Sequence, residues 1–407
     1  MKEKNLKYRK NSKSSELPVW NLNDLYTSIK SKELTKDIEF IRKNTKSFEK
    51  KYQNKIKNLN SVALHKAIVD LEKIDEKIDK ILSFAHLLLS EDINNQKNKI
   101  FFQEMQEKIT QFYSSIIFFG LELNQINEKK INLLVKNSLL SKYKTWIKNK
   151  RSFKAYQLDI NLEKLLQDKN LTSHNSWVRL FDETIASLNF PFKNKKLNSA
   201  EILNLLSDNK SSIRKLAAKS IGVTLGNNAN LFATITNTLA KDKSINDDWR
   251  KLPNPVSSRN LSNSVEDEVV ESLSKSVSNY YPKLSHRYYK MKAKWFGVKK
   301  LKYWDRNAPL PFQSKKEYSW IMAKNLVLDS YFQFNPMIGE IVKKFFDNSW
   351  IHSPPLKGKS PGAFSASTVP SVHPYILLNF QGKARDVSTL AHELGHLFLG
   401  HIQSRKT

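Results

Sequence analysis

The stretch from Thr389 to His396, which reads Thr-Leu-Ala-His-Glu-Leu-Gly-His, decides how the rest of the chain is interpreted. It holds two histidines four residues apart, and four residues of α-helix advance by about 6 Å and return to the same face. The imidazoles of His392 and His396 can then converge on one Zn²⁺ at roughly 2.0–2.1 Å each. Glu393 follows the first histidine, where its carboxylate can take a proton from a water that the metal activates. The pattern predicts a site for one zinc ion, with Glu393 as the catalytic base.

The pattern alone is loose, because it specifies only three positions. An ordinary amphipathic helix with two exposed histidines and one glutamate satisfies it equally well. The surrounding residues favour the metal site. Apolar side chains recur at helical spacing and predict a helix with one buried face: Leu390, Leu394, Leu397 and Phe398. Asp386 supplies a helix start signal, residues 374–380 are typical of a strand, and residues 381–383 are typical of a turn.

Three further segments resemble one family of enzymes. They are residues 361–387, which include Pro-Gly-Ala-Phe-Ser-Ala-Ser and Tyr-Ile-Leu-Leu-Asn-Phe, then residues 304–311, Trp-Asp-Arg-Asn-Ala-Pro-Leu-Pro, and residues 17–22, Leu-Pro-Val-Trp-Asn-Leu. Together with the histidine motif they resemble oligoendopeptidase F, in the thimet-oligopeptidase family of zinc peptidases. The resemblance spans nearly the whole chain and is far more specific than the motif.

This resemblance implies a fold and an activity. The fold is mainly α, with a multi-helix N-terminal domain and a zincin-type catalytic domain that has a small antiparallel sheet beside the HExxH helix. The activity is zinc-dependent hydrolysis of internal bonds in short, unfolded peptides. In the family an edge strand near the metal holds the substrate backbone, and Gly362, Ala363 and Phe364 stand where that strand should be. Residues 363–369 and 375–380 predict an antiparallel pair, and simple sheet pairing without substrate contact remains an equal alternative.

The third metal ligand is missing from the sequence. A catalytic zinc uses three protein ligands and a water, and the histidine pair supplies two. The resemblance implies a later glutamate as the third ligand, followed by a histidine and a tyrosine that stabilise the oxyanion, and none of these precedes Thr407. We therefore expect a truncated chain with an incomplete catalytic domain, low stability and little or no activity, whose remainder could be encoded separately. The substitute ligands are weak candidates: His401, Asp305 and Asp386.

Helical periodicity dominates the rest of the chain. It predicts long helices over residues 36–58, 60–92 and 95–125, with three antiparallel helices as the simplest arrangement. Shorter helices follow over 126–180, then a loop or small hairpin over 189–197, and helices over 198–224, 227–243, 265–280, 283–296, 315–332 and 336–348. Ser199 and Ser264 are candidate helix caps. We divide the chain into a disordered basic leader (1–15), an N-terminal helical domain (16–195) and an incomplete catalytic domain (196–407).

Composition limits the function classes. A chain of 407 residues is too long for a single hydrophobic core, so two domains are expected. Hydrophobic residues make up 40% and no run of 18 apolar residues occurs, so a transmembrane helix is not expected. Cysteine is absent, which excludes a disulfide framework and thiolate metal sites and makes the cytoplasm the default location.

The net charge of +29 admits two explanations. One is binding to nucleic acid or to an anionic membrane surface. The other is a proteome-wide compositional bias, which is favoured because the basic residues are mostly lysines spread along the chain without an arginine-rich patch. Neither a specific nucleic acid nor a membrane is therefore expected as a partner. Three hypotheses remain: a zinc oligopeptidase, an inactive remnant or peptide-binding module of the same ancestry, and a basic helical binding protein.

Overall fold

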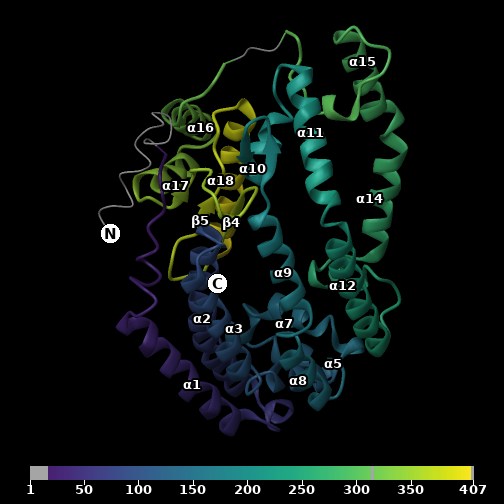
Figure 1. The fold of residues 1–407 in the computed structure, drawn as a ribbon. Helices are drawn as coiled ribbons and strands as arrows, with labels where there is room; N and C mark the ends of the chain where they lie inside the picture. The colour runs from purple at the N-terminus through teal and green to yellow at the C-terminus, as the bar shows by residue number, and fades with distance from the viewer. Residues whose placement is uncertain (1–16, 313–315, 405–407) are drawn as a thin grey trace.

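Long amphipathic helices build the first half of the molecule, as their periodicity predicts (Figure 1). The computed structural model describes residues 17–312 and 316–404, with side chains through His396. The first three long helices pack on one another: α1 (Lys32–Tyr52), α2 (Ser61–Glu91) and α3 (Gln96–Tyr113). Each begins at a side chain that accepts a hydrogen bond from a backbone amide in its first turn, and these caps are Ser31, Asn60 and Asn95. A 3₁₀ turn (Ile56–Asn58) precedes α2.

The helix predicted over 95–125 is interrupted earlier than expected. It ends at Tyr113, and α4 (Phe118–Gln125) begins after a short turn, so Gly120 lies inside a helix and is not the break. The hydroxyl of Ser114 donates to the carbonyl of Thr110 at 3.2 Å, a local bond that competes with helix continuation. The turn allows Phe118 and Phe119 to be fully buried in the core of the first helices. Tertiary packing therefore decides the break.

Shorter helices and a hairpin follow, as predicted. They are α5 (Glu128–Leu134), α6 (Ser138–Ser141), α7 (Lys144–Arg151), a 3₁₀ turn (Lys154–Tyr156), α8 (Ile160–Lys169) and α9 (His174–Ser187), and then β1 (Phe190–Phe192) and β2 (Lys195–Leu197). The two strands pair antiparallel, which confirms the hairpin interpretation of residues 189–197.

The middle of the chain is helical, but two predicted caps are wrong. Its helices are α10 (Ser199–Leu205), α11 (Ser211–Gly226), α12 (Ala229–Arg250), α13 (Ser257–Ser262), α14 (Asp267–Tyr280) and α15 (Arg287–Trp295), with a π-helical turn (Pro282–His286) before α15. Asn198 caps α10 and forms a capping box with Glu201, so Ser199 is already helical. Ser264 lies in a left-handed turn (φ 53°), and the carboxylate of Asp267 accepts instead from Asn260 at 2.8 Å.

A small sheet and three helices complete the described chain. The strand order is β3 (Ile351–His352), β5 (Tyr375–Leu377), β4 (Phe364–Ala366). The predicted antiparallel pair is confirmed, with Phe364 opposite Leu377. Strand β3 runs parallel to β5 and was not predicted, because two residues carry no periodicity. A 3₁₀ turn (Tyr303–Asp305), α16 (Trp320–Phe334) and α17 (Pro336–Asp347) precede the sheet, and α18 (Ala384–Ser404) follows it.

The start of the described chain lies against this late sheet. The amide of Asn21 donates to the carbonyl of Ser349 at 2.8 Å, and the amide of Ser353 donates to the carbonyl of Pro18 at 2.9 Å. The hydroxyl of Tyr375 donates to the carbonyl of Asn21 at 3.0 Å. The core of the first helices also includes side chains of β5, so the two halves share apolar packing. The boundary at residues 195/196 stays a prediction, and the leader (1–15) lies outside the described residues.

Within the described ranges, no helix combines the length and the apolar character that crossing a bilayer requires.

Candidate metal centre

The helix that carries the histidine pair begins at Ala384, and the predicted start signal, Asp386, lies in its first turn. The carboxylate Oδ2 of Asp386 accepts from the backbone amides of Gln381 and Lys383, at 2.9 Å each. An acidic residue in the first turn also complements the positive end of the helix dipole. Gly382 has φ +85° in the connecting turn, a conformation that favours glycine. The turn, the capping carboxylate and the strand before them thus determine where α18 begins.

Burial of one face of α18 orients the motif. Leu390 and Leu394 are fully buried and pack with apolar residues of α16 and α17. His392 and His396 are exposed on another face of the helix. The periodic leucines of the motif thus direct both imidazoles away from the core.

The two imidazoles converge as a metal site requires. The Nε2 atoms of His392 and His396 are 3.0 Å apart, and the rings are edge-on, with centroids at 4.5 Å. A tetrahedral zinc with bonds of about 2.0–2.1 Å separates two nitrogen ligands by roughly 3.3–3.4 Å. The pair therefore fits a shared zinc after a small side-chain adjustment. Without metal, one ring can donate its N–H to the other, and zinc binding would displace that proton.

Glu393 follows His392 directly, and its carboxylate has no partner among the described residues. It is 8% exposed, and the described residues provide it with neither a hydrogen bond nor an ion pair. A carboxylate without a partner in a mostly buried position is able to accept a proton. The motif therefore combines two nitrogen ligands and one available base on neighbouring turns of a single helix.

The described residues do not complete the ligand set. No group of three His, Cys, Asp or Glu side chains among them could hold a metal ion. Asp386 caps α18, and Asp305 forms a buried ion pair with Arg214 at 2.6 Å, so both weak candidates already have other partners. The side chain of His401 lies outside the described residues.

The proposed substrate strand lies at the edge of the sheet. Strand β4 packs against α18, and it pairs with β5 on one side only within the described chain. Gly362 precedes it with φ +81°, and its carbonyl accepts from Asn379 Nδ2 at 2.9 Å. Ala363 packs with the apolar cluster of α18, while the ring of Phe364 lies 5.6 Å from that of His86 on α2. The three residues are thus held on both sides, and the outer edge of β4 is free to accept a backbone.

A buried lysine that sequence reasoning missed holds the loop before β4. Lys359 is 5% exposed, and its Nζ donates to the carbonyls of His352, Pro354 and Leu378 at 3.1, 2.7 and 2.7 Å. Burial lowers the pKa of Lys359 to about 7, and the charge of Glu91 acts in the opposite direction. Nothing distinguishes this lysine locally in a chain with 68 basic residues.

The same loop is joined to the end of α2 through its backbone. The amide of Ile93 donates to the carbonyl of Gly358 at 2.7 Å, and the amide of Ser360 donates to the carbonyl of Ser90 at 2.9 Å. Gly358 has φ +82°, and an added Cβ would meet Asp92 Oδ1 at 2.4 Å. Glycine is required there, and the first helices thereby position the candidate substrate strand.

Two family models match most of the chain. The model described as Oligopeptidase F matches residues 122–190, and the model described as Peptidase family M3 matches residues 204–406. The second match includes α18 with the histidine pair. The chain belongs to peptidase family M3. This establishes the predicted family.

Relatives within family M3 are similar but longer. The chain is 23% identical over 389 residues to oligopeptidase PepF of Bacillus subtilis, which covers 93% of this chain and 57% of PepF. It is 27% identical over 386 residues to an oligoendopeptidase F homolog of Borreliella burgdorferi, covering 93% of this chain and 63% of the homolog. The chain thus spans about three fifths of these relatives.

Solved structures in the same group share the fold. A putative oligoendopeptidase F from Bacillus anthracis superposes with a TM-score of 0.70 at 19% identity, covering 90% of this chain and 65% of that one. A putative peptidase from Chlamydophila abortus superposes with a TM-score of 0.63 at 20% identity, covering 96% and 67%. The mainly helical architecture with a small sheet is therefore the one expected from the sequence.

Proposed function

We propose that this chain carries the zinc-binding helix of an endopeptidase that hydrolyses internal bonds of short peptides. The observation that carries the proposal is the 3.0 Å approach of the two Nε2 atoms, with the uncommitted carboxylate of Glu393 beside them. Membership in family M3 and the similarity to oligopeptidase PepF support a peptidase. The lack of cysteine suits a reducing compartment, so we place the activity in the cytoplasm.

Each residue has a definite task in this proposal. His392 and His396 would hold one zinc, which when bound polarises the scissile carbonyl and lowers the pKa of water. Glu393 takes the proton of the attacking water and delivers it to the leaving amine. The substrate backbone adds to the free edge of β4 at Gly362, Ala363 and Phe364, which aligns the peptide beside α18.

The proposal includes a dependence on a further segment. The described residues supply two of the three protein ligands, and the relatives extend well beyond the matched region. We expect the chain alone to bind zinc weakly and to cleave little, until a segment with a carboxylate ligand is supplied. Peptide binding without cleavage is the second candidate, favoured by the free edge of β4.

Zinc titration and peptide cleavage test the proposal together. Calorimetry should show that His392→Ala and His396→Ala each weaken zinc binding, while the exposed His286→Ala does not. Cleavage of a quenched peptide is measured with a polypeptide that corresponds to the remaining part of a relative, and a chelator should abolish it. Glu393→Gln should retain zinc and lose cleavage. Unchanged cleavage in Glu393→Gln, or zinc affinity that ignores both histidine substitutions, would refute the assignment.

A further inference from the structure

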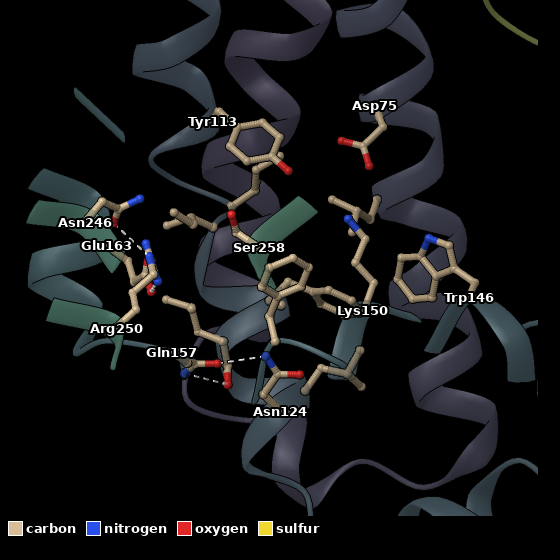
Figure 2. A pocket seen from close by; sticks show the side chains of 18 of the residues that line it. Asp75, Tyr113, Asn124, Trp146, Lys150, Gln157, Glu163, Asn246, Arg250 and Ser258 are labelled. Atoms are coloured by element: carbon tan, nitrogen blue, oxygen red, sulfur yellow. Dashed lines mark hydrogen bonds and ion pairs between the residues drawn. The ribbon is translucent and has the colours of Figure 1, made fainter. Parts of the chain in front are cut away.

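A cavity lies among the helices that precede the small sheet, apart from the histidine pair. Its volume is about 400 Å³, within the usual range of small-molecule sites (Figure 2). It is lined by residues of α2, α3, α4, α7, α8, α12 and α13 and of the turns next to them. In Figure 1, α7 and α12 lie below and to the right of the α18 label. Apolar and aromatic side chains form much of its wall: Leu71, Ile116, Phe119, Leu123, Trp146 and Phe153.

Two opposite charges face this cavity without neutralising each other in a direct pair. Asp75 on α2 has neither a hydrogen bond nor an ion pair within the described residues. Burial, with Asp79 and Glu72 acting in the same direction, raises the pKa of Asp75 to about 6, while Lys150 lowers it. The ammonium of Lys150 lies 5.8 Å from the centroid of the Trp146 ring. Figure 2 shows Asp75 and Lys150 on the same side of the cavity as Trp146.

The other two charged side chains that line the cavity, Arg250 and Glu163, already pair with each other. Arg250 donates to both carboxylate oxygens of Glu163, at 2.6 and 2.8 Å, and to Asn246 Oδ1 at 2.9 Å. An incoming ligand would therefore meet one acid and one base, Asp75 and Lys150. A ligand that carries both charges would complement them best.

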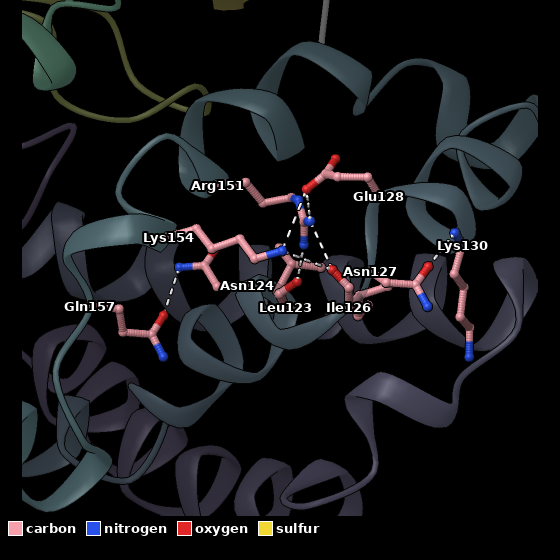
Figure 3. Close-up of polar contacts among 9 residues, drawn as sticks. All are labelled: Leu123, Asn124, Ile126, Asn127, Glu128, Lys130, Arg151, Lys154 and Gln157. Carbon is pink, nitrogen blue, oxygen red and sulfur yellow. Dashed lines mark hydrogen bonds and ion pairs between the residues drawn. The ribbon is translucent and has the colours of Figure 1, made fainter.

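A buried amide supplies an unused acceptor. Asn124 is 7% exposed, and its Nδ2 donates to Gln157 Oε1 at 2.8 Å, whereas its Oδ1 has no partner. Figure 3 shows how the end of α4 is held: Arg151 donates to the carbonyls of Leu123 and Ile126 and pairs with Glu128. In Figure 2 this amide lies at the opposite end of the cavity from Asp75, so it takes no part in the charge contacts proposed below.

We propose that this cavity binds a free amino acid or dipeptide with an aromatic side chain. The α-ammonium would lie at Asp75, the carboxylate at Lys150, and the ring against Phe119, Trp146 and Phe153. A free amino acid or a dipeptide is small enough to fit a cavity of this volume. None of these residues lies on α18, so this inference does not depend on the metal centre.

Ligand variants test the charge complementarity first. Calorimetric titration of the full chain with L-phenylalanine should show binding. N-acetyl-L-phenylalanine lacks the ammonium and L-phenylalaninamide lacks the carboxylate, so each should bind about tenfold more weakly or worse. Equal binding of all three, or no binding of L-phenylalanine in the millimolar range, would overturn the proposal.

Protein variants test the residues. Asp75→Asn and Lys150→Met should each reduce the affinity for L-phenylalanine about tenfold or more. Asp79→Asn, on the same helix but outside the lining of the cavity, is the matched control and should retain affinity. Circular dichroism and thermal unfolding confirm that each variant folds. Glu393→Gln should bind L-phenylalanine like the wild type, so the two proposals can fail separately. Equal losses in Asp75→Asn and Asp79→Asn would rule out a direct contact with Asp75.

Discussion

The hydroxyl of Tyr331 donates a hydrogen bond to the carbonyl oxygen of Ala391 at 2.7 Å. Ala391 immediately precedes His392, so this bond joins α16 to the turn of α18 that carries the motif. Burial raises the pKa of Tyr331, which keeps the phenol protonated as a donor at neutral pH. The same hydroxyl lies 3.2 Å from the position that a Cβ at residue 395 would occupy. Gly395 therefore permits the close approach of the two helices.

We predict that Gly395→Ala and Tyr331→Phe are coupled. In the wild-type background the added methyl crowds the Tyr331 hydroxyl, which offsets the gain of up to about 1 kcal/mol in helix propensity. In Tyr331→Phe, which loses about 1 kcal/mol with its hydrogen bond, Gly395→Ala should be clearly stabilising. Urea unfolding of the double-mutant cycle measures the coupling.

The control for this cycle is Gly222→Ala. Gly222 lies inside α11 and has no atom within 4 Å of an added Cβ. It should stabilise the chain equally in both backgrounds. Additive effects at Gly395 and Tyr331 would show that their contact carries no energy.

A second prediction concerns the buried ion pair of Arg214 and Asp305. Arg214 is 1% exposed and donates to Asp305 Oδ1 through Nε at 3.1 Å and Nη2 at 2.6 Å. Its Nη1 donates to the carbonyls of Asp208 and Asn209. Arg214→Met leaves two carbonyls without this donor and leaves Asp305 with only the Ser211 hydroxyl, at 3.2 Å, so we expect a loss of about 3–5 kcal/mol in the free energy of unfolding. Denaturant titration measures this loss.

The exposed ion pair of Arg42 and Glu39 is the matched control for that loss. Arg42→Met should change the free energy of unfolding far less than Arg214→Met, because solvent screens the exposed pair. A similarly small effect at Arg214 would mean that solvent reaches the buried pair.

A third prediction concerns Lys359. Lys359→Met removes the donor of three buried carbonyls, so the loop before β4 should loosen and the chain should lose about 2 kcal/mol or more. Amide exchange should rise locally in residues 353–362. Lys357→Met in the same loop is exposed and should change neither quantity. Uniformly faster exchange across the chain would contradict a local positioning role.

A fourth prediction concerns the pH dependence of stability. The pKa of Asp75 rises to about 6 in the folded chain, from 3.8, so the folded state holds this proton more tightly than the unfolded state. Its contribution therefore falls as the pH rises from about 4 through 6, by at most about 3 kcal/mol. Asp75→Asn should be more stable than the wild type at pH 7, and this advantage should shrink at pH 4. Thermal unfolding across this range checks the sign, and an advantage that is constant with pH would contradict it.

The sequence by itself determined the helices, the hairpin, the antiparallel strand pair and the histidine motif of α18. These features repeat locally: apolar residues every three or four positions along α2, a cap before each long helix, and two histidines one turn apart. Their physical cause lies within a few residues of chain, so the pattern is visible without the fold.

Only the tertiary structure decided which distant groups complete one another. Ser353 bonds to Pro18, Arg214 pairs with Asp305, and Lys359 bonds to carbonyls in or next to the neighbouring strands β3 and β5. A partner outside the next few turns of the chain leaves no periodic signal, and one lysine among many basic residues resembles a surface lysine until the chain folds over it. Packing, not local pattern, therefore determined which residues hold α18 in place and which residues line the cavity.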